Sequence, residues 1–561
     1  MMPCKLNPHI LAYIEDVEAN RIQACILQHQ LVAYIRKCFE TEDIHVDDNL
    51  LEKYLDQVKY FPYDRLFPWE EFVLALHCCT FRADGMPRWP DLFLLIGRGA
   101  GKDGYIAFEG WCLAGPYSGL YRYDVDICAN NEDQAAAPFE DIWNVLEDPT
   151  NRKRMTKHFY WNKEEIISLK SKARIKFRTN NPKGKDGLRS GIVYFNEIHQ
   201  YTDYKNINVF TTGLGKKRHP RRGYMTTNGD VRDGPLDHYV ARSKEILEGK
   251  MEDNGWLPFI CMLDNKKEAH DPTKWEKANP SLPYRRDLSE EIAKEYRDWK
   301  DAPSQFTDFM TKRMNIPDGN PEIEVTSWDN ILKTNRPIPD LTGFTGIVGV
   351  DFASITDFAT VGILMKQNGI RYWITHSWIC RQSKDLHRLK IPYEEWAKAG
   401  YLTIVDDVEI HPDLLAEWIT KQAEKYFLKK IVIDNFRYAL LTKTLRDIGF
   451  DKTEYKNVML TRPSDIIKVI PVIDSMFANG TIIWGDNPLM RWYTNNTKKV
   501  PASANEKRIS GSDQFGNYKY AKIEEKSRKT DGFFALAAAM ACESELPEQA
   551  SDFTDLGVFT Y

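Results

Sequence analysis

The sequence predicts an α/β protein with at least two domains, and three observations support this. The chain has 561 residues, enough for more than one hydrophobic core. Before residue 334, short apolar runs alternate with helical segments, which is typical of a mostly parallel sheet. Beyond a Pro-rich stretch at 334–342, three apolar runs follow one another too closely for crossover helices, so an antiparallel meander is expected.

The composition is that of a folded protein without a membrane segment. The chain is 42% hydrophobic and 28% charged. Its longest apolar runs, at 72–76 and 533–540, are far shorter than the roughly 18 residues of a membrane-spanning helix, and the amino terminus does not resemble a signal peptide. The ten cysteines form no CxxC pair, so we expect free thiols in the cytosol. With a net charge of −5, only local basic patches would contact a polyanion.

The predicted elements divide the chain into four parts. A helical amino-terminal segment covers 1–60, an α/β domain 61–333, a linker 334–342 and a second domain 343–561. The strands expected in the α/β domain are 91–97, 121–129, 173–179, 191–197 and 221–227.

The second domain has a different order of elements. The meander strands are expected at 346–352, 358–365 and 371–379, with Asn368-Gly369 in the second turn because both residues tolerate positive φ. A helix at 411–427, an apolar run at 429–436, a helix at 437–448 and a final small-residue helix at 532–542 follow. This βββ-α-β-α order with a terminal helix is that of the RNase H-like nuclease fold.

Residues 94–110 (LLIGRGAGKDGYIAFEG) contain the parts of a phosphate-binding loop: a strand, a glycine-rich turn, a lysine and a helix start. The nucleotide-binding residues predicted there are Gly97, Arg98, Gly99, Ala100, Gly101 and Lys102. Lys102 would reach the β- and γ-phosphates of ATP. Two residues depart from the usual pattern, since Ile96 replaces the first glycine and Asp103 replaces Ser or Thr. The alternative is a glycine-rich turn with an incidental lysine.

An apolar strand ending in polar residues, at 192–197, supplies the second half of such a site. Glu197 is the candidate general base that orients the attacking water. Asn196 stands where an aspartate that binds Mg²⁺ is expected. Because a carboxylate appears instead at Asp103, we hypothesise a swapped metal shell in which Asp103 holds Mg²⁺ and Asn196 adds a neutral oxygen.

Two further segments are candidates for nucleotide contacts. Thr226 and Thr227 begin the stretch 226–229 (TTNG), whose hydroxyl and amide groups could sense the γ-phosphate, although the tetrapeptide alone is only a turn signal. Trp69 precedes the loop, where its indole either stacks on adenine or lies in the core.

Three aspartates in the second domain are predicted to converge as a metal-dependent nuclease site. Asp351 lies on the first strand, Asp434 at the end of the fourth and Asp531 at the start of the last helix, while Asp357 is a lesser candidate. Hydrolysis of a phosphodiester with two metal ions needs such convergent carboxylates. Each aspartate alone would more often be a strand end or a helix cap.

Basic clusters occur at 216–222 (KKRHPRR), 152–154 and 522–529. They could neutralise DNA phosphates without reading bases, although most charge runs are solvated loops. Among Arg218, Arg221 and Arg222, one arginine could instead act in trans on the ATP of a neighbouring subunit.

The ordered motifs resemble the large terminase subunit family of tailed phages. They are PWEEF, GRGAGKD, ANNEDQA, FNEIHQY, TTGLGKKRHP, TTNGD and WEKANPSL, followed by GVDFASITDFA, VIDNF, NPLMRWYTNN and KTDGFFALAAAM. The resemblance covers about residues 60 to 545. It implies that Lys102, Arg98, Glu197 and 226–229 serve ATP hydrolysis.

The same resemblance implies cofactors and partners. ATP and Mg²⁺ are expected, with Mn²⁺ able to substitute in the nuclease. The implied partners are double-stranded DNA, the small terminase subunit, the portal protein of a procapsid and further copies of the chain in a ring, all in the host cell cytoplasm and without a membrane.

Two other readings compete with a packaging enzyme. One is a catalytically degenerate prophage protein that binds ATP and DNA, but Lys102 and Glu197 are retained. The other is a repair helicase-nuclease, which would need further helicase motifs and a second motor domain.

Overall fold

The computed structural model describes residues 6–179, 189–232, 234–303, 305–317, 324–352, 358–383, 386, 389, 391–407, 409–501, 518–523 and 528–548. The chain divides into two compact units, Met1–Asp318 and Gly319–Tyr561. No helix of the described residues is long and apolar enough to cross a membrane.

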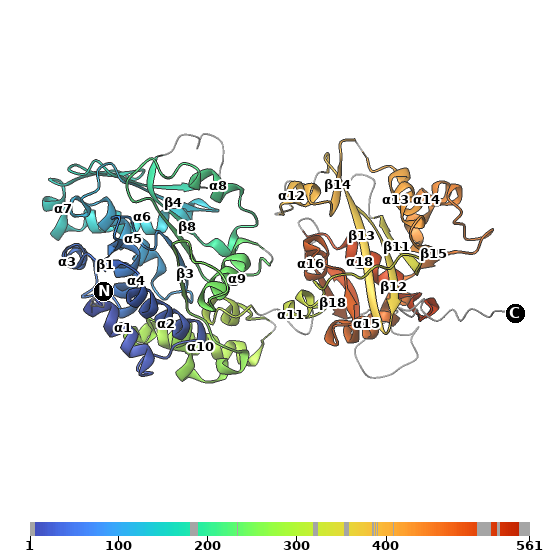
Figure 1. Ribbon diagram of the computed structural model, residues 1–561, viewed down its shortest axis with the longest axis horizontal. Coiled ribbons are helices and arrows are strands. Elements are labelled where there is room, and N and C mark those ends of the chain that lie inside the picture. Colours follow the sequence, from blue (N-terminus) through green and yellow to red (C-terminus); the bar gives the residue numbers. More distant parts are fainter. Residues whose placement is uncertain are drawn as a thin grey trace. The chain divides into compact units, whose positions relative to one another are not determined.

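The first unit is built on an eight-stranded sheet (Figure 1). Its strands run in the order β10(Trp256–Ile260), β3(Asp91–Leu95), β9(Arg221–Thr226), β8(Ser190–Asn196), β4(Asp124–Ala129), β7(Arg174–Thr179), β6(Ile166–Ser168) and β5(Phe159–Trp161). Neighbours from β10 to β7 are parallel, and β7, β6 and β5 are antiparallel. The mostly parallel sheet is therefore confirmed. The edge strand β10 was not predicted, because it is short and contains Pro258.

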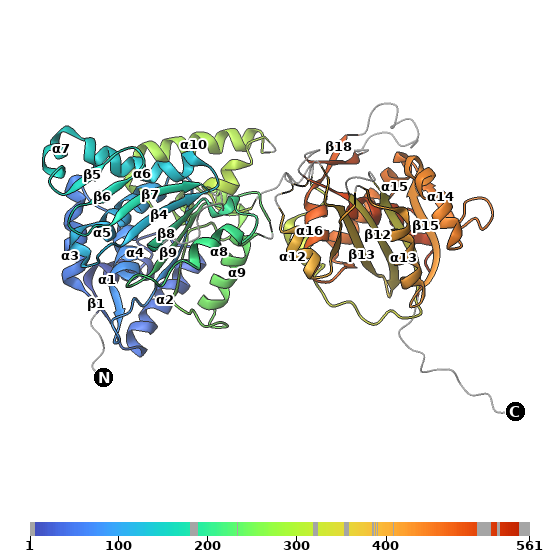
Figure 2. The ribbon, with the colours of Figure 1, turned by 90° about the horizontal axis from the view of Figure 1, so that it is seen from above.

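Helices cover both faces of this sheet, because successive strand residues point to opposite sides. Leu94 packs on the face of α1(Pro8–Glu18), α2(Ile26–Thr41), α4(Pro68–Cys79), α5(Lys102–Ala114) and α6(Glu132–Glu147). Phe93 and Leu95 pack on the face of α8(Lys205–Thr211) and α9(Pro235–Leu247). Figure 2 shows α5 and α8 on opposite sides of the sheet. Ile14 and Leu31 are fully buried, so the first helices belong to the core of this unit.

The remaining described α-helices and strands of this unit are short or lie at its end. They are β1(Ile44–Val46), β2(Thr80–Arg82), α3(Asp48–Leu55), α7(Pro149–Met155) and α10(Arg286–Asp301), with a π-helical turn, η7(Phe309–Arg313). Residues 263–316, including α10 and η7, form a separate small core around Trp275, Ile292 and Met310. We call this stretch the 263–316 segment.

The second unit contains a seven-stranded mixed sheet. The strand order is β14(Leu402–Val405), β13(Ile370–Cys380), β12(Phe358–Gln367), β11(Thr345–Phe352), β15(Phe427–Asp434) and β16(Val458–Thr461), with β17(Ile482–Ile483) beside β13. The predicted antiparallel meander β11-β12-β13 is confirmed. Its second turn has positive φ at Asn368 (52°) and Gly369 (76°), which explains the Asn-Gly pair.

Helices cover both faces of the second sheet as well. One face packs against α15(Pro463–Ala478), α16(Pro488–Asn495) and α18(Asp531–Met540), the other against α13(Pro412–Ala423) and α14(Asn435–Asp447). The other described α-helices and strands are α11(Trp328–Leu332), α12(Tyr393–Lys398), β18(Thr497–Pro501) and β19(Tyr518–Lys522). Alanines let α18 lie so close to β11 that a Cβ at Gly349 would collide with the carbonyl oxygen of Ala535.

The Pro-rich stretch 334–342 lies within the second unit, whereas the division falls earlier, after Asp318. Thr334 is buried and its carbonyl oxygen accepts a hydrogen bond from the Trp484 amide (3.2 Å). Leu341 is also buried in the core of that unit. The linker was expected here because prolines prevent regular structure, but the apolar residues between them pack.

Candidate active sites

The glycine-rich loop joins the carboxyl end of β3 to the start of α5. Gly99 (φ 83°) and Gly101 (φ 110°) take the left-handed backbone that makes the turn, and α5 begins at Lys102. Ile96 is fully buried and its amide donates to the carbonyl oxygen of Thr226 (3.1 Å). It therefore continues the strand pairing and needs no glycine, which accounts for the first departure from the usual loop.

Lys102 lies at the centre of a polar cluster formed by the ends of β3 and β8. Its ammonium group is 2.6 Å from Asn196 Oδ1, 2.9 Å from Asp103 Oδ1 and 3.1 Å from Glu197 Oε1. Asn196 Nδ2 donates to the same Asp103 oxygen at 2.9 Å and to the Gln134 carbonyl at 3.0 Å. The two residues that depart from the common pattern, Asp103 and Asn196, are thus in direct contact.

Glu197 is held ionised in this cluster. Burial alone would raise its pKa, but the Lys102 ammonium and the His199 imidazole, 3.1 Å away, bring the pKa down to about 2. Burial alone would lower the pKa of Lys102, but the carboxylates of Glu197 and Asp103 raise it above its ordinary value. The backbone of Glu197 is left-handed (φ 56°), a conformation that is rare for a residue with a side chain and that is often found at functional sites.

His199 was not singled out from the sequence. It follows Glu197 by two positions, and the short turn Ile198–Gln200 brings its ring back to the glutamate. A histidine two residues after a candidate base was the available signal, but its meaning depends on that turn.

The other predicted nucleotide contacts occupy different positions. The Thr226 hydroxyl accepts from the His199 amide (3.0 Å) and donates to the Thr227 carbonyl (2.6 Å), so it lies beside the cluster. Arg98 is half exposed at the outer side of the loop. Trp69 is 1% exposed and its indole donates to Ser281 Oγ (2.9 Å). Of the two alternatives for this residue, stacking on adenine or a place in the core, the structure has the second.

The second unit brings Asp351, Asp434 and Asp531 together. β11 and β15 are parallel, and the pairing of Val350 with Ile433 places the next residues, Asp351 and Asp434, side by side. Burial and the carboxylate of Asp531 raise the pKa of Asp351 well above its usual range, with a further rise from Asp434, while Lys522 and Arg437 lower it. Three carboxyls crowded in this way favour a divalent cation. Asp357 lies outside the described residues.

A buried hydroxyl network lies beneath these carboxyls. Thr360, directly opposite Asp351 on β12, is 2.9 Å from Ser377 Oγ, to which the Tyr493 hydroxyl donates at 3.1 Å. Asp531 is one of the groups that raise the pKa of Tyr493, after burial. The hydroxyls therefore lie near the acidic site.

The basic cluster 216–222 does not form one exposed patch. Arg221 is 1% exposed and donates to the carbonyl oxygens of His77, Cys78 and His219, so the suggestion that it contacts DNA or acts in trans is wrong. Its charge is used to bond buried backbone oxygens. Arg222 pairs with Asp91 at 2.8 Å. Both arginines start β9, at the sheet edge opposite the Lys102 cluster.

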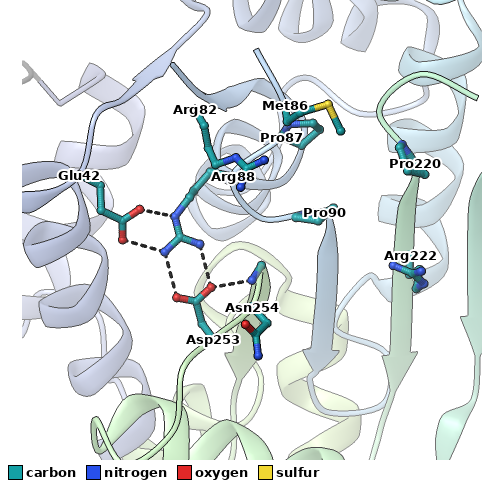
Figure 3. Close-up of a pocket in the computed structure, with 11 residues that line it drawn as sticks. Glu42, Arg82, Met86, Pro87, Arg88, Pro90, Pro220, Arg222, Asp253 and Asn254 are labelled. Atoms are coloured by element: carbon teal, nitrogen blue, oxygen red, sulfur yellow. Dashed lines mark hydrogen bonds and ion pairs between the residues drawn. The ribbon is translucent and has the colours of Figure 1, made fainter. Parts of the chain in front are cut away.

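A pocket of about 360 Å³ opens at that same edge (Figure 3). Arg88 crosses it between the carboxylates of Glu42 and Asp253, and Arg222 lies on its wall. The guanidinium of Arg88 is already paired with two carboxylates, so ion pairs hold the walls of the pocket together. The pocket is separate from the glycine-rich loop.

The other two basic clusters differ in accessibility. In 152–154, Arg152 pairs with Glu147 (3.2 Å) and Arg154 lies over the Tyr60 ring (5.1 Å). Of 522–529, residues 524–527 lie outside the described residues, and Lys529 is buried.

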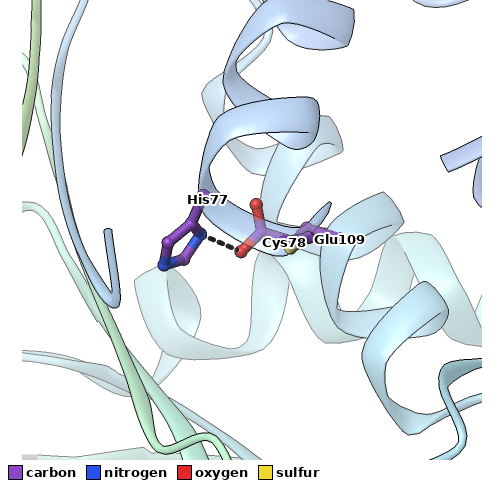
Figure 4. Close-up of side chains that lie close together, drawn as sticks. All are labelled: His77, Cys78 and Glu109. Carbon is purple, nitrogen blue, oxygen red and sulfur yellow. Dashed lines mark hydrogen bonds and ion pairs between the residues drawn. The ribbon is translucent and has the colours of Figure 1, made fainter. Parts of the chain in front are cut away.

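His77, Cys78 and Glu109 form a buried group that has the residue types of a metal site (Figure 4). Nδ1 of His77 is 2.8 Å from Glu109 Oε1 and Nε2 is 3.3 Å from the Pro90 carbonyl, while Tyr194 donates to the same carboxylate at 2.9 Å. These contacts engage the imidazole and the carboxylate, and they join α4 to α5 inside the core. The buried thiols of Cys78 and Cys79 at the end of α4 are core residues.

The fold and these two groups of residues define a class of protein. A phosphate-binding loop at the end of a parallel sheet and a carboxylate cluster on an RNase H-like sheet describe a P-loop ATPase fused to a nuclease.

The comparisons with known proteins identify the family. The family model described as "Terminase large subunit, endonuclease domain" matches residues 250–540, and "Terminase large subunit, ATPase domain" matches residues 122–245. The first match alone covers more than half of the chain, which therefore belongs to the terminase large subunit family and is an ATPase and a DNA endonuclease.

Individual relatives are distant. The terminase large subunit of Lactococcus phage p2 is 24% identical over 482 residues, which cover 84% of this chain and 85% of the relative. Protein YmfN of Escherichia coli (strain K12) is 24% identical over 373 residues, 63% of this chain and 78% of that protein. Among solved structures, the large terminase of bacteriophage HK97 matches with a TM-score of 0.47 and 17% identity, covering 89% of this chain and 100% of that one.

Proposed function

We propose that this protein packages viral DNA: ATP hydrolysis in the first unit drives double-stranded DNA into a procapsid, and a two-metal nuclease in the second unit cuts concatemeric DNA. The family membership and the presence of both activities in one chain support this proposal. The partners would be the small terminase subunit and the portal protein, with the chain acting as a homo-oligomeric ring in the host cell cytoplasm.

In the proposed ATPase reaction, Lys102 exchanges its present partners for the phosphates of ATP. It now contacts Asp103, Asn196 and Glu197, and the β/γ-phosphates would replace some of these contacts. Without the Lys102 ammonium beside it, the pKa of Glu197 would rise. The carboxylate would then be a stronger base for orienting and deprotonating the attacking water. His199 would keep the carboxylate in place.

Mg²⁺ that accompanies ATP fits the residues beside Lys102. Asp103 offers a half-exposed carboxylate, and the amide oxygen of Asn196, which now accepts from the Lys102 ammonium (2.6 Å), would add a neutral ligand. Bound there, Mg²⁺ would neutralise phosphate charge.

In the nuclease, Asp351, Asp434 and Asp531 would hold two divalent ions, Mg²⁺ or Mn²⁺. The raised pKa of Asp351 beside two other carboxylates supports this donor set, because cations would relieve the repulsion. Such ions activate water and stabilise the leaving oxygen. Lys522 and Arg437, which lower the pKa of Asp351, supply positive charge that a DNA phosphate could contact.

The observation that best supports the motor is the ion pair of Lys102, at the start of α5, with Glu197, which follows β8 (3.1 Å). Glu197→Gln should abolish ATP turnover and the ATP-dependent protection of DNA from DNase in procapsids, while nucleotide binding persists. Glu245→Gln, at an exposed position on α9, is the matched control and should retain both activities. Packaging by Glu197→Gln at the wild-type rate would contradict the proposal.

A further inference from the structure

Along its outer side, the backbone of the glycine-rich loop forms hydrogen bonds with the 263–316 segment. The Gly97 amide donates to the Ala278 carbonyl and the Arg98 amide to the Lys312 carbonyl, each at 2.7 Å. The carbonyl groups of the loop are bonded by side chains of the same segment, Arg98 by Arg313, Gly99 by Arg285 (2.8 Å) and Ala100 by Ser281 (2.5 Å). Residues 97–100 therefore all have a backbone group bonded to this segment.

The fit is close as well as polar. A Cβ at Gly97 would collide with the side chain of Asn279 and lie 2.6 Å from the Arg313 carbonyl oxygen, and a Cβ at Gly99 would lie 2.7 Å from the Arg313 guanidinium. At Gly97 the covering segment requires glycine, because the backbone oxygen of Arg313 leaves no room for a Cβ, whereas at Gly99 the positive φ requires it.

Two of the three side chains that make these contacts, Arg313 and Ser281, are themselves fixed. Arg313 is held in two parallel hydrogen bonds by Glu295 (both 2.7 Å), and it ends the π-helical turn η7, a feature often found at functional sites. Ser281 is fully buried and accepts from the Trp69 indole (2.9 Å) while it donates to the loop.

The same segment also contacts the second part of the ATP site. The amide and the side-chain Nδ2 of Asn228, in the 226–229 stretch, both donate to Asn315, each at 2.9 Å. Asn315 follows η7 by two residues and donates in turn to the Cys261 carbonyl (2.7 Å). Residues 312–315 thus bond both the phosphate loop and the stretch expected to meet the γ-phosphate.

We propose that the 263–316 segment is a clamp that sets the geometry of the phosphate loop, with Ser281, Arg285 and Arg313 as positioning residues for ATP hydrolysis. By drawing the carbonyl groups of residues 98–100 outward, the clamp leaves the amides of the following residues and the start of α5 turned toward the phosphates. The inference rests on the proposed ATP site at Lys102.

The segment also leads directly to the end of the first unit at Asp318. A change in the loop on ATP binding would therefore reach the last residues of that unit through a few hydrogen bonds.

Two pairs of variants separate positioning from folding. Ser281→Ala removes a buried hydroxyl that accepts from an indole and donates to a carbonyl. Ser243→Ala removes the same arrangement away from the loop, since Ser243 accepts from Trp256 (3.0 Å) and donates to Tyr239 (2.7 Å). Arg285→Ala and Arg286→Ala change adjacent exposed arginines, of which only Arg285 bonds the loop.

Steady-state ATP hydrolysis and binding of ATPγS are measured together with thermal unfolding. The two serine variants should lose similar stability, but only Ser281→Ala should lose kcat/KM for ATP, by roughly tenfold, with a smaller stabilisation by ATPγS. Arg285→Ala should lose about threefold to tenfold, while Arg286→Ala stays near the wild-type value.

The outcomes distinguish the clamp from the site itself. If wild-type protein binds ATPγS through Lys102, but Ser281→Ala and Arg285→Ala match their controls, the clamp is refuted and the ATP site stands. If Lys102→Ala binds ATPγS as well as wild type does, the proposed ATP site fails and the clamp with it.

Discussion

The hypothesis of a swapped metal shell, with the carboxylate at Asp103 in place of Asn196, can be tested by moving the carboxylate back. Asp103→Ser removes the oxygen that accepts from both Lys102 and Asn196, each at 2.9 Å. Hydrogen bonds to a charged group contribute about 1.5–3 kcal/mol each, but the Asp103 side chain is 42% exposed, so solvent screening reduces the effect. We expect Mg²⁺ binding to weaken by about 1.5 kcal/mol, so that the free Mg²⁺ concentration that half-saturates ATP turnover rises roughly tenfold.

The second substitution, Asn196→Asp, should restore what the first removes. The double variant again has one carboxylate and one hydrogen-bond donor across the same gap, and we expect its Mg²⁺ requirement to return to within about threefold of wild type. Asp447→Ser, which removes a negative charge from an exposed position on α14, controls for net charge. A double variant no better than Asp103→Ser would show that the two positions do not form one metal shell.

Three further predictions concern stability and the nuclease. Burial raises the pKa of Glu70 to about 8 from its ordinary 4.5, so its contribution to stability is complete below pH 4.5 and is lost as the pH rises through about 8. Glu70→Gln can still accept from the Phe67 amide, and its melting temperature should change less than that of wild type between pH 6 and 9, whereas parallel curves would refute this. Asp531→Asn should lower plasmid cleavage by at least about a hundredfold with ATP turnover unchanged, and wild-type cleavage would remove Asp531 from the site. Gly349→Ala should destabilise the second unit by about 1–3 kcal/mol in chemical denaturation, because its Cβ meets the Ala535 carbonyl oxygen, and unchanged stability would mean that α18 shifts freely.

The parts of the fold that sequence could predict are those governed by local pattern. Alternating apolar runs located the central strands of both sheets, and Asn368-Gly369 located a turn, because positive φ restricts the residues allowed there. The proximity of Asp351 and Asp434 also follows from topology, since adjacent parallel strands end at the same edge.

What could not be predicted depends on tertiary neighbours. Arg221 has the appearance of a surface charge in a run of basic residues, but it is buried because nearby carbonyl oxygens accept its hydrogen bonds. Ser281 is 181 residues from Ala100 along the chain, so no spacing rule links them. The Pro-rich stretch has the composition of a linker, but composition predicts only the absence of helices and strands and says little about packing.

The two departures from the common phosphate-loop pattern have different physical explanations. Ile96 stands where the backbone still pairs with β9, and the turn that needs glycine comes later, at Gly99 and Gly101, so the first departure alters no requirement of the loop. Asp103 and Asn196 face each other, and the donor that a Ser or Thr hydroxyl would supply at 103 is supplied from 196 by the Asn amide. Charge and hydrogen bonding around Lys102 are thereby kept while the residues exchange sides. A single substitution at either position should therefore be more harmful to ATP hydrolysis than both together. A loop that had lost its function would not show this dependence.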